Sequence, residues 1–216
     1  MGFMRLFRGW RKNGPSGRAD ASRQDLDLYW DPKMAALLES WGEGNAWHEA
    51  QFLFGGRSGR ALDVACGTGI VMEKLAAVSG LEIHGCDISD FLIGKARQRG
   101  IAADRLKVCD ATRLPYSTEE FDFSYSIGSL EHFTEEGIGK CFAEMARVTR
   151  QASYHFMPVS RSGRDEGWMK TLQSFHNCSV AWWRQRLTPH FPRIVDLPSL
   201  WKDDISLGRW FLCFKD

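Results

Sequence analysis

The chain has 216 residues, of which 44% are hydrophobic and 25% are charged, and its formal net charge at pH 7 is +1. This length predicts one domain with a packed core. The composition excludes wholesale disorder, a collagen-like repeat and a disulfide mini-scaffold. The sequence contains no run of about 18 apolar residues, so no transmembrane helix is predicted. Because the positive and negative charges nearly cancel, the net charge of the chain does not attract nucleic acid, and we expect no nucleic-acid partner.

The six cysteines form no Cys-x-x-Cys pair. Reduced cysteines behave as small hydrophobic residues, so we predict a reducing, cytoplasmic location without structural disulfides. The close cysteine and histidine spacings of a zinc site are missing, and no metal site is expected.

The N-terminal residues 1–19 are predicted to be a flexible basic leader, which ends in the turn-forming run at 13–17. There is no apolar segment of the kind that a secretory signal needs. The alternative is a small membrane-surface helix over residues 3–12, because aromatic and apolar side chains recur there at helical spacing with arginines between them.

Residues 20–216 are predicted to form a single domain. N-terminal helices are expected over 20–57, a core of alternating strands and helices over 58–158, a cap or acceptor region over 159–192, and a final antiparallel strand pair over 193–216. In the core, apolar runs at 60–65, 81–86, 106–109, 121–126 and 153–158 alternate with helical patterns at 70–78, 89–99 and 135–148. This alternation predicts a parallel sheet with helices on both faces.

The strongest motif is the string Asp63-Val-Ala65-Cys-Gly67-Thr68-Gly69, in which a strand leads through a carboxylate into a glycine-rich turn that opens a helix. Glycines let backbone pass close to a ligand and adopt positive φ. The turn follows the first strand, where open α/β sheets bind ligands. The dinucleotide pattern G-x-G-x-x-G fails at Met72, and no Walker A sequence is present.

Two more carboxylates follow the next two strands. Asp87 comes after the second strand, about 20 residues beyond the glycine turn, where an acid is placed to bind both hydroxyls of a ribose. Asp110 comes after the third strand. Three acids at successive strand ends would line one edge of the sheet.

With these motifs, the segment of about residues 58–158 resembles the class I S-adenosylmethionine-dependent methyltransferases, in particular their small-molecule group. The resemblance implies a Rossmann-like, doubly wound seven-stranded sheet, mostly parallel with an antiparallel final strand. It implies that the loop wraps the methionine moiety, that Asp87 holds the ribose and Ile88 packs on the adenine, and that Asp110 and Ala111 face the adenine amine. The loop residues are Asp63, Ala65, Gly67, Thr68 and Gly69, and the tail after the fourth strand, Ser126–Phe133, places Ser126 at the cofactor.

Two departures from the family pattern stand out. Ala65 replaces a glycine, and the usual Pro-Gly-Gly before the fifth strand is replaced by Thr149-Arg-Gln-Ala152. We expect the turn there to be atypical, with a local effect only.

Methyl transfer is an in-line displacement, and a hydroxyl or acidic carbon acceptor needs a base. His132 is the candidate, because histidine titrates near neutrality; the alternative is a packing or capping histidine. Glu131 beside it is expected to be solvated or to cap a helix. His176 and His155 are further candidates, but His155 lies in an apolar strand, where a satisfied core histidine is expected.

The sequence predicts S-adenosylmethionine-dependent methyl transfer to a small-molecule oxygen, nitrogen or carbon nucleophile. The aromatic and arginine residues of 159–192 fit a flat or anionic acceptor. The alternative is a non-catalytic, cofactor-binding partner or regulatory protein. Nucleic-acid modification is disfavoured, since no Asn/Asp-Pro-Pro-Tyr string follows the fourth strand, and Met72 and Ala65 contradict a nicotinamide oxidoreductase. The oligomeric state is not predicted.

Overall fold

The computed structural model describes residues 24–170 and 173–216, so the predictions for the leader at 1–19 and the helix at 3–12 lie outside the described residues. Seven strands form one sheet in the order β3-β2-β1-β4-β5-β9-β8. Their bounds are β1 Ser58–Val64, β2 Gly80–Asp87, β3 Leu106–Val108, β4 Phe121–Ile127, β5 Thr149–Ser160, β8 Arg193–Lys202 and β9 Ser206–Phe214.

The pairing of the strands confirms the predicted sheet. The neighbours from β3 to β5 pair in parallel, whereas β9 pairs antiparallel with both β5 and β8. The central strands are buried on both faces, as the unbroken burial of Phe123–Ile127 shows, and such strands are expected to be continuous apolar runs. Pro198 lies in β8, an outermost strand, where a missing backbone N–H costs little.

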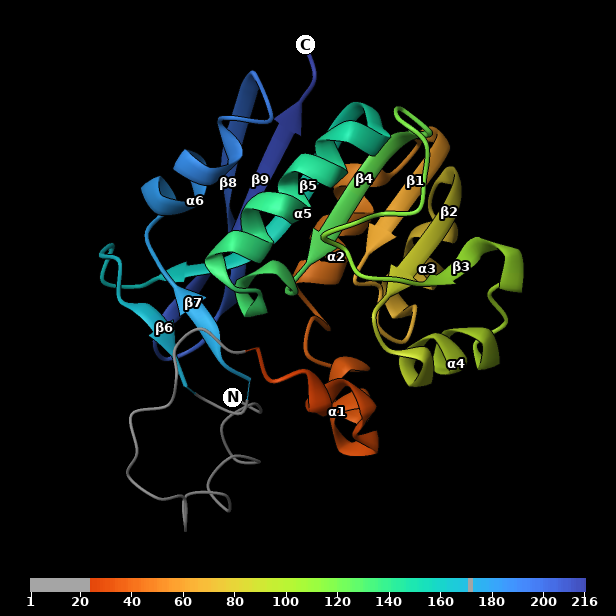
Figure 1. Ribbon diagram of the computed structural model, residues 1–216, viewed down its shortest axis with the longest axis horizontal. Helices are drawn as coiled ribbons and strands as arrows, with labels where there is room; N and C mark the ends of the chain where they lie inside the picture. Colours follow the sequence, from red (N-terminus) through yellow and green to blue (C-terminus); the bar gives the residue numbers. More distant parts are fainter. Residues whose placement is uncertain (1–23, 171–172) are drawn as a thin grey trace.

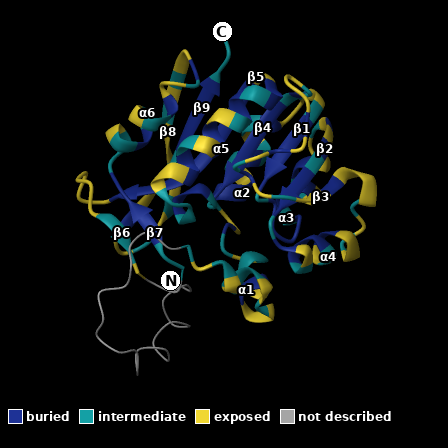
Figure 2. Cartoon of the chain, viewed as in Figure 1, coloured by how far each residue is buried: buried dark blue, intermediate teal, exposed yellow. Residues whose placement is uncertain are grey.

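Helices cover both faces of the sheet (Figure 1). The α2, α3 and α4 helices (Ala46–Phe54, Ile70–Ala76 and Asp90–Gln98) pack on one face, and α5 and α6 (Glu135–Val148 and Val180–Leu187) pack on the other. The strands between them are the most buried part of the chain (Figure 2). Within the described ranges, no helix combines the length and the apolar character needed to cross a bilayer.

The N-terminal part and the region after β5 are built from short elements. The η3 segment (Leu26–Trp30), the short α1 helix (Pro32–Leu38) and α2 lie within the range 20–57 where N-terminal helices are expected. The expected cap or acceptor region after β5 contains a small antiparallel pair, β6 (Gly167–Met169) and β7 (Phe175–Asn177). Two further 3-10 turns, η4 (Ala103–Arg105) and η5 (Leu130–His132), complete the elements.

The chain passes from α5 to β5 without a turn, because the helix ends at Val148 and the strand begins at Thr149. The Thr149 side chain is buried, and its hydroxyl lies 2.6 Å from that of Ser124 on β4. The pairing of β4 with β5 shifts register between Phe121 and Phe123. The missing Pro-Gly-Gly is therefore accommodated by a register shift at the start of the strands, far from their carboxyl ends.

Candidate cofactor and acceptor site

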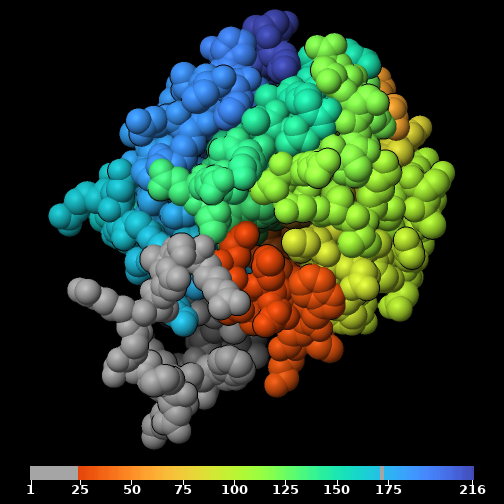
Figure 3. Space-filling view, in the orientation of Figure 1, coloured from red at the N-terminus to blue at the C-terminus, as the bar shows by residue number. Residues whose placement is uncertain are grey.

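The carboxyl ends of β1, β2, β3 and β4 surround a cavity of about 270 Å³. It lies where the strand order reverses between β1 and β4, the position at which open α/β sheets bind ligands. The N-terminal segment forms another wall through Leu26, Tyr29, Leu38 and Trp41. Figure 3 shows this segment, in red, packed against the yellow and green segments that carry the strand ends.

The loop after β1 bends back through three residues with positive φ, Ala65 at 60°, Gly67 at 56° and Gly69 at 76°. The Cys66 amide donates to the Cys86 carbonyl over 2.9 Å, which ties the loop to the end of β2. A Cβ on Gly69 would lie 2.5 Å from the Cδ1 methyl of Ile101 and 3.0 Å from the Cβ of Ala96, because α4 and the segment after it pack closely against this position. This geometry keeps the loop backbone, rather than bulky side chains, at the cavity wall.

Asp87 is fixed at the end of β2 by backbone donors. One carboxyl oxygen accepts from the Gly67 amide and the other from the Ser89 amide, both over 2.9 Å. Burial raises the pKa of Asp87, and these two hydrogen bonds oppose the rise. Burial also raises the pKa of Asp63, whose phenolic neighbour Tyr125 opposes the rise while the charge of Asp87 adds to it. The cavity therefore has one carboxyl group, that of Asp87, held by two backbone donors, and a second buried carboxyl group, that of Asp63.

The cavity fits a ligand that carries hydroxyl and amino groups. Two carboxyl groups line it, Asp63 and Asp87, and both are acceptors when ionised. The Thr68 hydroxyl also belongs to a lining residue and is buried, with no hydrogen-bond partner within residues 24–170 and 173–216. Such an orphaned polar atom at a cavity wall points to a ligand partner. The residues present therefore fit the ribose and amino-acid parts of S-adenosylmethionine.

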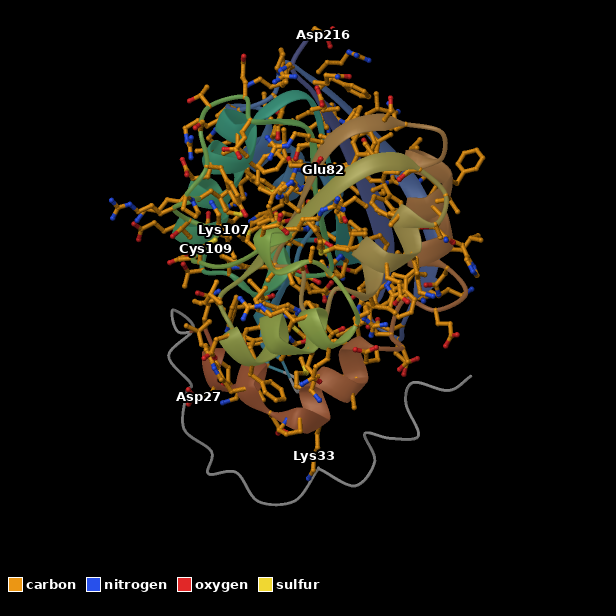
Figure 4. The ribbon with its side chains drawn as sticks, turned by 90° about the vertical axis from the view of Figure 1, so that its right-hand side faces the viewer. Asp27, Lys33, Glu82, Lys107, Cys109 and Asp216 are labelled. Carbon is orange, nitrogen blue, oxygen red and sulfur yellow. The ribbon has the colours of Figure 1, made fainter. Side chains whose placement is uncertain are left out.

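The ends of β2 and β3 contribute a further group of lining residues, which are Cys86, Ile88, Cys109, Asp110 and Ala111. Asp110 accepts from both the amide and the hydroxyl of Thr112 over 2.8 Å, which orients its carboxylate. In Figure 4 the labelled Cys109 lies beside Lys107 at the end of β3, above the N-terminal segment that carries Asp27 and Lys33. Ile88 and Ala111 offer apolar contacts, and Asp110 offers a hydrogen-bond acceptor, to a bound ring.

The structure brings together nine of the residues expected at the cofactor or as the base. Asp63, Ala65, Gly67, Thr68, Asp87, Ile88, Asp110, Ala111 and His132 all line the cavity. Gly69 instead sits at the start of α3 as its N-terminal flanking residue. Ser126 is fully buried behind the wall and lies 3.0 Å from Nδ1 of His155.

His155 is a satisfied core histidine, as expected. Its Nδ1 pairs with the Ser126 hydroxyl, and its Nε2 lies 3.1 Å from the Ser153 hydroxyl. Burial lowers the pKa of His155 to about 3. The ring therefore remains neutral and structural.

His132 and Glu131 lie together in the η5 turn. Nδ1 of His132 lies 2.9 Å from the Ser174 carbonyl, so this nitrogen carries the hydrogen and Nε2 is the free base. The expectation that Glu131 is solvated or capping is wrong, because the residue is only 5% exposed. It is buried because η5 turns inward between β4 and β7, a long-range placement that the local sequence does not encode.

Sequence reasoning missed Trp41 and Gln173, which also line the cavity. Trp41 has the helical spacing of an ordinary core residue, and Gln173 lies in a segment without a pattern. Tyr29 on η3 lines the cavity as well. The Tyr29 carbonyl accepts from the Ser89 hydroxyl over 2.7 Å, which anchors the cover to α4.

Replacing Ala65 with glycine is expected to raise the free energy of unfolding by up to about 1 kcal/mol, because an alanine with positive φ is strained by roughly 1–2 kcal/mol and the more flexible unfolded glycine chain offsets part of the gain. The matched change Gly67→Ala places a side chain at φ 56° with its nearest neighbour, Leu38, 3.5 Å away. It should lower stability by the same order. Urea denaturation of both variants measures the two signs, and equal signs would contradict the strain argument.

A family model described as a methyltransferase domain matches residues 61–152. The Homo sapiens protein named Probable tRNA methyltransferase 9B is 38% identical over 109 residues, which cover 49% of this chain and 23% of that protein. An Arabidopsis thaliana tRNA (carboxymethyluridine(34)-5-O)-methyltransferase is 32% identical over 129 residues, covering 59% and 27%. A demethylmenaquinone methyltransferase of Mycobacterium sp. (strain KMS) is 38% identical over 96 residues, covering 44% and 39%.

Solved structures share the fold. A methyltransferase in complex with the Haloferax volcanii Trm112 methyltransferase activator superposes with a TM-score of 0.67 at 15% identity, covering 88% of this chain and 98% of that one. The chain spans about a quarter of the length of the human curated relative, 23% of it.

These relatives correct one expectation. The expectation of no nucleic-acid partner is contradicted, since similar proteins are named as tRNA methyltransferases. It failed because it rested on net charge, which describes the whole chain and not the surface around one site. The matched domain, the strand order and the position of the cavity all indicate the same methyltransferase fold. Residues 61–152 match a methyltransferase domain, and the fold around them is that of the class I S-adenosylmethionine-dependent methyltransferases, whose cofactor is S-adenosylmethionine.

Proposed function

We propose that the protein transfers the methyl group of S-adenosylmethionine to an oxygen, nitrogen or carbon nucleophile beside His132. One observation carries this proposal: a single cavity brings the loop after β1 and the carboxylate of Asp87 together with the histidine that follows β4. A protein that only binds the cofactor has no need for a free imidazole nitrogen at the same cavity.

The cofactor-binding roles follow from the positions of the walls. Asp87 would accept hydrogen bonds from the ribose hydroxyls, and the backbone of the loop from Asp63 to Gly69 would surround the amino-acid part. Ile88 and Ala111 would pack on the adenine faces, with Asp110 facing its amine. These assignments are supported by the lining of the cavity and by the fixed orientation of both aspartates.

When bound, S-adenosylmethionine supplies an electrophilic methyl group, whose bond to sulfur breaks with the electron pair left on sulfur. The chain supplies the base. Burial lowers the pKa of His132 to about 4, so the ring is neutral at pH 7. The Ser174 carbonyl fixes the tautomer, and Nε2 can take the proton of an acceptor hydroxyl as the new bond to carbon forms.

Two acceptor classes have support. The names of the human and Arabidopsis thaliana relatives favour a tRNA nucleotide. The name of the Mycobacterium relative favours a small aromatic acceptor, as does the cover that Leu26 and Tyr29 place over the cavity. Both classes suit a nucleophile presented to one methyl group in a largely enclosed site.

A transfer assay with methyl-labelled S-adenosylmethionine separates the two classes. Unmethylated tRNA carrying carboxymethyluridine and a demethylmenaquinone are the two probes. A tRNA acceptor should show a rate that falls steeply between 50 and 200 mM salt, on the order of a hundredfold or more, because phosphate contacts release counterions. Binding of the cofactor without transfer to either probe would favour the non-catalytic alternative.

Replacing His132 with alanine is expected to lower kcat for a hydroxyl acceptor by about 10²- to 10⁴-fold, the usual contribution of a general base. The affinity for S-adenosylmethionine should change less than about twofold, since the histidine lies at the acceptor end. Steady-state kinetics and calorimetric titration measure the two effects separately. An unchanged kcat would remove His132 from the reaction.

A further inference from the structure

Glu131 is a buried acid that the proposed reaction does not use. It lies in η5, next to the histidine, and its Oε2 has no hydrogen-bond partner within residues 24–170 and 173–216. An unpaired buried carboxyl costs free energy and is retained where it serves a purpose. Its other oxygen, Oε1, lies 3.7 Å from Nε2 of His132.

The His132 ring has a defined orientation toward Glu131. Nδ1 of His132 is held by the Ser174 carbonyl, so the nitrogen that faces Glu131 is the one that is free to take a proton. His132 is one of the residues that line the cavity, whereas Glu131 is buried and is not one of them. A carboxylate at this distance stabilises a positive imidazolium and raises the basicity of a neutral imidazole.

We propose that Glu131 is the positioning residue of this site: once ionised, its carboxylate orients the His132 ring and stabilises the imidazolium that forms when Nε2 takes the acceptor's proton. The inference rests on the proposed methyl transfer. The proton moves from the acceptor to Nε2, and the electron pair it leaves behind makes the bond to the methyl carbon. Glu131 gains no proton and forms no bond in this step.

The charge states of the neighbouring groups make the idea testable. Burial raises the pKa of Glu131 to about 8. Tyr29 on η3 has its pKa raised by burial and by the charges of Glu131 and Asp87, so its phenol stays neutral. His176 on β7 acts on His132, and burial lowers its own pKa, so that it too is neutral above pH 7. Glu131 is then the group of this cluster that titrates near pH 8.

The deciding experiment follows the ring nitrogens of His132 by two-bond ¹H–¹⁵N spectra of the full chain from pH 5 to 10. In the wild type the His132 signals should shift near pH 8, although the ring itself is already neutral there. The shift should disappear in Glu131→Gln, and it should persist in Glu43→Gln, which removes the same charge from an exposed position. His155, which is bonded to two serines, should not move in any of the three proteins.

Two results overturn the assignment. One is a wild-type titration without a transition of the His132 signals near pH 8, a measurement that does not depend on the folding of any variant. The other is a transition that survives in Glu131→Gln. With an acceptor that the transfer assay identifies, Glu131→Gln should lower kcat about tenfold at pH 9 and less than twofold at pH 6. A failed transfer assay counts against the proposed function, whereas the titration decides the role of Glu131.

Discussion

Replacing Asp87 with alanine is expected to weaken the binding of S-adenosylmethionine by about 10²- to 10⁴-fold. Each hydrogen bond from a ribose hydroxyl to a carboxylate contributes roughly 1.5–3 kcal/mol, and the loss of two such bonds corresponds to this range of affinity. The substitution also leaves the amides of Gly67 and Ser89 without their acceptor, so the loop loses its anchor to β2. Calorimetric titration with S-adenosylmethionine measures the loss.

Two variants separate the ribose contact from general damage. Asp87→Asn keeps one acceptor oxygen and should lose part of the affinity only. Asp104→Ala removes an exposed acid from the η4 turn and should bind as the wild type does. If Asp87→Ala is folded and binds within about threefold of the wild type, the ribose is not held at the end of β2.

The cofactor half of the site could be predicted from the sequence because its information is local. The loop with Gly67 and Gly69 needs positive φ, which few residues tolerate. Asp87 ends β2 and Asp110 lies two residues after β3, and parallel strands end at the same edge. Spacing along the chain therefore determines where these groups meet.

The acceptor half could not be predicted in the same way, because it is assembled from segments far apart in the chain. The ring of His132 is oriented by the carbonyl of Ser174, and the cover comes from Tyr29 through its bond with Ser89. The burial of Glu131 depends on these contacts. A glutamate beside a turn has the local pattern of a solvated residue, and its environment is defined only when the region after β5 folds over it.

The same long-range dependence makes Gly128→Ala the most destabilising single change that we predict, at about 2–4 kcal/mol. Gly128 has φ 64°, where a side chain costs roughly 1–2 kcal/mol. Its Cβ would lie 2.8 Å from two ring carbons of Trp41, and overpacking adds about 1–3 kcal/mol. The Trp41 ring has little room to move away, because it packs against three other aromatic rings, those of Trp47, Phe156 and Trp201.

Gly94→Ala is the matched control, since that glycine lies within α4 and an added Cβ meets nothing within 4 Å. It should raise the free energy of unfolding by about 0.5–1 kcal/mol through helix propensity. Urea denaturation measures the free energy of unfolding of both variants, and its dependence on urea concentration, the m value, should be the same in the two. Because Trp41 lines the cavity, Gly128→Ala should also weaken cofactor binding. A loss of stability without a loss of affinity would show that Trp41 supports the fold alone, and that the cover of the site begins at Tyr29.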